Sequence, residues 1–191
     1  MKRRAVGSVL AAMLIALSSS STSAQSGTPP TAATDVTKAD IEAVLKHPQG
    51  GGDRQIKVVD MGKYNVAIGV LHRNAVKPSA TGTVNGIAHT EVTEVYYITS
   101  GGGTLVTGGT ILNPKPLAAD AEVVKVAVGP SVNGTFQGGQ TRKVSAGDMV
   151  IIPPGVLHGW AEVPDHVTYV SVRPDAGHIL PAGYVHPAVK K

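Results

Sequence analysis

Residues 147–158 read GDMVIIPPGVLH, and this stretch decides the fold that we expect for the chain. Gly147 can adopt a positive φ and suits a tight turn. The short apolar run at 149–152 contains β-branched residues, which is typical of a buried strand. The prolines at 153–154 have no backbone N–H to donate, so they end that strand. The stretch therefore places His158 at the start of a new strand, directly after a rigid corner.

The spacing of this stretch resembles the second conserved motif of the cupins. Gly147 is followed after five residues by Pro153, after one more by Gly155, and after two more by His158. The family motif usually ends in Asn, where Glu162 stands in this chain. Together with the density of predicted strands and turns, the resemblance implies a single-domain, all-β, double-stranded β-helix (jelly-roll or cupin) barrel with one short N-terminal helix.

The first cupin motif is present in part. Its tail matches Glu94, followed after six residues by Gly101. His89 fits the second His of the motif, whereas the first His would fall at Ile87, which cannot bind a metal. The resemblance therefore implies that His89 and Glu94 join the histidine of the second motif, His158, as ligands of one divalent metal ion.

A further ligand or substrate contact is predicted from the strand at 64–72. Val66, Ile68, Val70 and His72 share one of its faces, because side chains alternate along a strand. Three apolar residues on that face indicate that it points inward, so His72 would lie at the inner end of an apolar stripe and could complete the metal site. A hydrogen-bonded histidine in the core or at the rim explains the pattern equally well.

The interval between His89 and Glu94 is odd, which would place them on opposite faces of a flat strand. A kink or bulge is needed to bring both to one metal ion. Glu91 lies two residues after His89, which would place both on the same face of a strand, so Glu91 is an alternative ligand. Tyr96 shares the face of Glu94, and Trp160 lies on the face that carries the second motif's histidine. Both aromatic residues are candidates for lining a pocket, although plain core packing also explains Trp160.

The first residues of the chain predict a signal peptide and not a part of the fold. Basic residues at 2–4 precede a short apolar segment at 6–17, and small residues at 22–24 offer a cleavage site. We expect cleavage after residue 24 and export to the periplasm or beyond. Cleavage would remove three of the positive charges behind the net charge of +4. No basic surface for nucleic acid or membrane would then remain.

The absence of cysteine excludes disulfides and thiolate ligands. Thr37 and Asp40 predict an acidic capping box at a helix start. Residues 122–128 (EVVKVAV) predict a strand, flanked by irregular stretches at 108–121 and 129–139. After the signal peptide we expect, in order, a flexible lead, a helix with a Gly-rich loop, the cupin barrel and a C-terminal tail, at residues 25–36, 37–52, 53–175 and 176–191.

Imidazole and carboxylate ligands without thiolate favour Fe, Mn, Ni, Cu or Zn. Two His and one carboxylate would let ferrous iron bind oxygen and substrate together, and zinc could activate water or polarise a carbonyl. We expect an exported metal-binding cupin that acts on a small polar organic molecule, as an oxygenase, isomerase or lyase. The alternatives are a cupin that holds a small ligand without turnover and a barrel whose metal site has decayed, and Ile87 favours both. The resemblance also implies a homodimer, since cupins often pair through edge strands.

Overall fold

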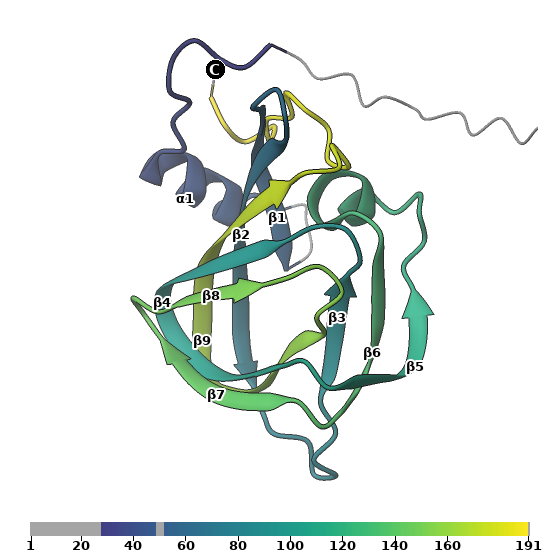
Figure 1. The fold of residues 1–191 in the computed structure, drawn as a ribbon. Helices are drawn as coiled ribbons and strands as arrows, with labels where there is room; N and C mark the ends of the chain where they lie inside the picture. Colours follow the sequence, from purple (N-terminus) through teal and green to yellow (C-terminus); the bar gives the residue numbers. More distant parts are fainter. Residues whose placement is uncertain (1–27, 49–51, 191) are drawn as a thin grey trace, which may run out of the picture.

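The computed structural model of the 191-residue chain describes residues 28–48 and 52–190 (Figure 1). The predicted signal peptide at 1–24 lies outside the described residues. Within them, one α-helix precedes nine β-strands, and a short π-helix lies between the fifth and sixth strands. The elements are α1 (Lys38–Lys46), β1 (Asp53–Asp60), β2 (Asn65–Val76), β3 (Asn85–His89), β4 (Glu94–Thr107), β5 (Thr110–Pro116), η1 (Val124–Val128), β6 (Ser131–Gln137), β7 (Gln140–Ser145), β8 (Met149–Ile152) and β9 (His158–Asp175).

The strands pair antiparallel and wrap around a common interior (Figure 1). One layer of the barrel contains β1, β2, β9, β4 and β8. The other layer contains β9, β3, β6 and β5, with β7 beside the second half of β4. The long strands β4 and β9 pair with each other and serve both layers. The predicted all-β double-stranded β-helix with a short N-terminal helix is confirmed. Its sheet does not close, because β1, β5, β7 and β8 each have one partner among the described strands.

The turn before β8 forms as the sequence predicts. Gly147 has a φ of 95°, in the left-handed region that favours glycine, and its N–H donates to the carbonyl of Ile98 at 2.9 Å. Strand β8 was expected to be buried, but Met149 and Ile151 are 65% and 72% exposed. Only one face of β8 packs on the interior, because side chains alternate along the strand and Val150 and Ile152 take the buried positions.

The corner after β8 is tied directly to β3. The N–H of Gly155 donates to the carbonyl of His89 at 2.7 Å, just before β9 begins at His158. The corner therefore brings the two predicted histidine ligands together through the backbone.

Strand β2 is apolar on both faces, and each face packs against a different part of the molecule. Ile68 and Val70 pack against α1 through Val44 and Leu45, as the neighbouring positions of α1 and β2 in Figure 1 show. The opposite face of β2 points into the barrel, where Leu71 joins the core formed mainly by β4 and β9. The apolar stripe that predicted an inward face is therefore the face covered by the helix.

The predicted strand at 122–128 is wrong. Residues Val124–Val128 form the π-helix η1, with Val124, Ala127 and Val128 buried in a cluster of their own. The buried residues are three and four positions apart, which is the spacing of one face of a helix. Valine has an intrinsic preference for strands, and this preference led to the wrong prediction. The flanking stretches expected to be irregular instead contain β5 and β6, which pair with each other.

The C-terminal tail returns along β1. The N–H of His186 donates to the carbonyl of Ile56 at 2.8 Å, and Leu180 and Val189 are buried. Asp175, the last residue of β9, accepts hydrogen bonds from the N–H groups of Ile179 and Leu180. The tail thus holds the end of β9 in place.

Candidate metal centre

Three side chains from three different strands meet inside the barrel. His89 is the last residue of β3, Glu94 the first of β4 and His158 the first of β9. One nitrogen or oxygen atom of each lies within 4.8 Å of those of the other two. The three residues are 4%, 1% and 4% exposed. The group is therefore held by strand backbone and is nearly shielded from solvent.

The odd interval between His89 and Glu94 is absorbed by a break in the sheet. Residues 90–93 belong to no strand, and the N–H of Thr90 donates to the carbonyl of Pro130 at 2.9 Å. The chain therefore leaves β3 and enters β4 with an irregular connection, as the spacing requires. This connection lets both side chains face the same interior.

Both imidazoles turn their Nε2 atoms toward the same carboxylate oxygen. The Nε2 of His89 lies 3.2 Å from Oε2 of Glu94, and the Nε2 of His158 lies 3.3 Å from it. Three atoms that can all bear lone pairs thus converge on one small region.

The opposite nitrogens show which tautomers the neutral rings adopt. The Nδ1 of His158 lies 3.0 Å from the carbonyl of Val156, which can only accept, so Nδ1 carries the proton. The Nδ1 of His89 lies 2.8 Å from Oγ of Ser131, and that hydroxyl already donates to the carbonyl of Gly129. Nδ1 of His89 is therefore also the donor. Both Nε2 atoms are then left unprotonated and free to bind a cation.

The second oxygen of Glu94 is held by donors from β9. Oε1 accepts hydrogen bonds from Oγ of Ser171 at 2.9 Å and from Nε of Arg173 at 2.8 Å, and a terminal nitrogen of Arg173 lies 2.8 Å from it. Burial is the largest influence on Glu94 and raises its pKa, but Arg173 and the two histidines together outweigh it and hold that pKa well below its usual range. Glu94 is therefore an anion whose Oε2 points at the two histidines.

Arg173 is the centre of a buried polar cluster. It is 0% exposed and donates to Gln55 at 3.0 Å as well as forming an ion pair with Asp53. Desolvation lowers the pKa of Arg173, but Asp53 and Glu94 outweigh this and raise it. Gly69 on β2 leaves room for the guanidinium, since a Cβ there would lie 2.7 Å from its Nη1.

Tyr96 donates its hydroxyl to the oxygen that faces the histidines. Its OH lies 2.8 Å from Oε2 of Glu94, and its ring meets that of His158 edge-on with centroids 6.0 Å apart. Burial, and then the charge of Glu94, raise the pKa of Tyr96 well above its ordinary value. Tyr96 is therefore a protonated donor that orients the carboxylate. It was expected to line a pocket, and it lies in the core beside the site.

A cavity of about 740 Å³ opens beside His158. Trp160 lines it, as the sequence predicts, and also packs in the core at 9% exposure. Ile87, at the position where the family motif has its first His, lines it too. Of the three residues of the group, only His158 lines this cavity.

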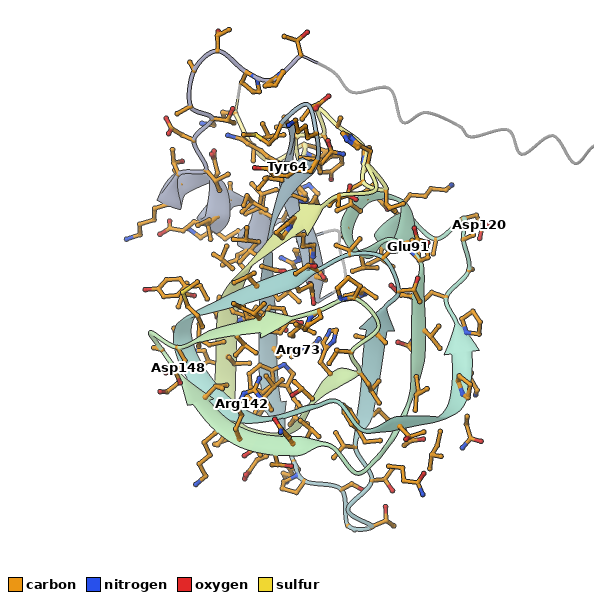
Figure 2. All side chains as sticks on the ribbon, in the orientation of Figure 1. Tyr64, Arg73, Glu91, Asp120, Arg142 and Asp148 are labelled. Atoms are coloured by element: carbon orange, nitrogen blue, oxygen red, sulfur yellow. The ribbon has the colours of Figure 1, made fainter. Side chains whose placement is uncertain are left out.

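The structure does not bring His72 to this group. His72 is exposed, its Nδ1 lies 2.8 Å from Oγ1 of Thr168, and its ring stacks on His166 at 5.8 Å. It lies on the outer face of β2, because α1 and not the barrel interior packs on the apolar stripe. Glu91 is also exposed, and it lies well apart from Arg73 in Figure 2. Neither residue completes the site.

Sequence reasoning missed Arg173 and Ser131. Arg173 shares its face of β9 with Val167, Tyr169 and Ser171, which are all buried, so alternation alone could have indicated a buried cation. Ser131 carried no such signal, because its role depends on the pairing of β3 with β6.

No family model and no curated protein matches the chain. Solved structures do match it. A protein of Bacillus halodurans is 13% identical, with 84% of this chain and 93% of that chain covered and a TM-score of 0.43. A cupin protein from Bacteroides fragilis is 15% identical, with 66% and 79% covered and a TM-score of 0.34. An uncharacterized conserved protein with a double-stranded β-helix domain from Klebsiella pneumoniae is 18% identical, with 76% and 93% covered and a TM-score of 0.37.

The matching structures thus include cupin and double-stranded β-helix proteins, the class that the two sequence motifs resemble. Likeness at this level concerns the fold and does not decide what the chain does. Among the described residues, no helix combines the length and apolar character needed to cross a membrane.

Proposed function

We propose that the protein is an exported cupin that binds one divalent metal ion through His89, Glu94 and His158 and uses it on a small polar organic molecule. One observation carries the proposal. The Nε2 atom of His158 is buried and has no hydrogen-bond partner among the described residues. A buried polar atom without a partner is costly, and a bound cation removes that cost.

The distances within the group fit a shared ion. Nitrogen and oxygen ligands lie about 2.0–2.2 Å from a zinc ion, so neighbouring ligands at bond angles near 90–110° lie roughly 3.0–3.4 Å apart. The two Nε2 atoms lie 3.2 and 3.3 Å from Oε2 of Glu94. The donor set of two imidazoles and one carboxylate suits Fe, Mn, Ni, Cu or Zn.

A metal ion held in this way would polarise a bound carbonyl or water, or, as ferrous iron, bind oxygen beside a substrate. The chain's own residues prepare the ligands. Ser131 and the carbonyl of Val156 hold the histidine tautomers, while Arg173 keeps Glu94 ionised. Partners of this kind typically change metal affinity by about 10–100-fold when they are removed.

Metal analysis of the purified mature protein tests the proposal. We expect about one divalent ion per chain, lost in His89→Ala and His158→Ala and kept in His72→Ala. His72→Ala is the matched control, because it removes an exposed histidine of the same barrel that lies outside the group. Folded wild-type protein that carries no metal, and takes up none of the five candidate ions, would refute the proposal.

Oxygen consumption and product analysis with candidate substrates then separate an enzyme from the second candidate, a cupin that holds a small ligand without turnover. Ile87 favours the second candidate, since it lines the cavity where the family motif has a further ligand. Export and a homodimer belong to the proposal as well. The mass of the protein from the periplasm, expected to start near residue 25, tests export, and light scattering tests the dimer.

A further inference from the structure

The cavity beside His158 has a chemical character of its own. Its wall includes two cations, Arg73 from β2 and Lys115 from β5, and the amide side chains of Asn113 and Asn133. None of the described residues that line it is acidic. At neutral pH the lining is therefore positively charged, which concentrates small anions in the cavity.

Arg73 is the group best placed to bind an anion. It projects toward the barrel interior (Figure 2) and is half-buried. Its Nε donates to the hydroxyl of Tyr169 at 3.2 Å, and among the described residues it forms no ion pair. A guanidinium has five N–H donors, so its two terminal nitrogens are left to face a ligand.

The bond to Tyr169 also fixes the orientation of this guanidinium. Tyr169 is 0% exposed and packed against Tyr96 and Trp160, so its hydroxyl is a rigid anchor for Nε. An oriented planar fork matches the two oxygens of a carboxylate, which it can bind through two parallel hydrogen bonds.

The remaining wall is partly apolar. Ile87, Val76 and Trp160 line the same cavity, whose volume of about 740 Å³ falls within the usual range for small-molecule sites. A ligand with a charged end and an apolar body would satisfy both parts of the wall.

We infer that the cavity is a site for small organic carboxylates, with Arg73 as the anchor for the carboxylate and Lys115 as a second cation at the rim. The inference rests on the proposed function only in taking this cavity as the place where the substrate binds. It narrows the substrate from a polar organic molecule to an organic acid.

Trp160 is the one tryptophan of the chain and lines the cavity, so its fluorescence reports binding. We would titrate the protein with cyclohexanecarboxylate, with the neutral and similarly shaped cyclohexanecarboxamide, and with inorganic phosphate. The carboxylate is expected to bind at least about 10-fold more tightly than the amide, because a charge-assisted pair adds to the shared apolar contact.

Arg73→Gln is expected to lower carboxylate affinity by about 10-fold or more and to leave amide affinity unchanged. Arg142→Gln is the matched control, since Arg142 donates to Thr107 on β4 and does not line the cavity.

Because Arg73 also holds Tyr169, Lys115→Gln provides a second variant at an exposed position, where a loss of carboxylate affinity of about 2–5-fold is expected. Circular dichroism checks that each variant folds.

Each titration is run on metal-stripped and on metal-loaded protein. A preference for the carboxylate that persists without metal supports the inference even if the metal analysis fails. Metal binding together with equal affinity for carboxylate and amide would overturn the inference and leave the proposed function standing. A preference unchanged in Arg73→Gln, or phosphate binding tighter than the carboxylate, would also overturn it.

Discussion

Replacing Arg173 by methionine is expected to destabilise the barrel strongly. The side chain is completely buried and is the cation that faces both Glu94 and Asp53. Methionine fills much of the same volume and so isolates the loss of charge from the loss of packing. Removing one partner of a buried ion pair costs about 3–5 kcal/mol, because the remaining charge is left uncompensated.

Urea unfolding of the metal-stripped protein at pH 7, followed by circular dichroism, measures the loss in the free energy of unfolding. Arg142→Met is the control, because Arg142 makes one hydrogen bond, to Thr107, and no ion pair among the described residues. Its expected cost is below about 1 kcal/mol.

The pH dependence gives a second, independent readout. In the wild type the pKa of Glu94 is depressed on folding, so its stabilising contribution is present above the unfolded pKa of about 4.3 and is lost as the pH falls below it. In Arg173→Met only the two histidines still oppose burial, so the pKa of Glu94 is expected to rise and acidification to cost the folded variant less than the wild type. The difference in the free energy of unfolding between wild type and variant should therefore shrink from pH 7 to pH 4. A loss below about 1 kcal/mol at pH 7, or a difference that grows on acidification, would refute this account of the cluster.

Three further predictions follow from single contacts. Ser131→Ala leaves Nδ1 of His89 without its acceptor, and metal affinity should fall by about 10–100-fold in a chelator competition; unchanged affinity would contradict the tautomer argument. Thr37→Ala removes the capping box of α1 and should cost about 1 kcal/mol in thermal unfolding, whereas an unaltered melting temperature would show that α1 adds no stability through its cap. Gly69→Ala forces a Cβ against Arg173 and should cost about 1–3 kcal/mol; a neutral effect would show that the guanidinium has room to move.

The sequence predicted those parts of the molecule that depend on local chemistry. Gly147 and the prolines after β8 define a corner through their own backbone preferences, so the position of His158 followed from a single stretch. The capping box of Thr37 and Asp40 was equally local, and both of its hydrogen bonds are present.

The parts that the sequence did not predict depend on contacts between distant segments. The face of β2 that carries Ile68, Val70 and His72 was predicted to point into the core. The sequence does not show that α1 covers the apolar part of this face, so the position of His72 was predicted wrongly. Arg173 lies beside Glu94 because β4 and β9 pair with Val95 opposite Val172. That register is set by the whole sheet.

The position of β9 has a consequence for how the protein would acquire its ion. His158 and Arg173 both belong to this strand, so the chain must be synthesised at least as far as β9 before the ligand group can assemble. A chain that crosses a membrane unfolded would then meet its metal only at its destination. Under that route, the ions available in that compartment, and not those of the cytoplasm, would select the occupant of the site.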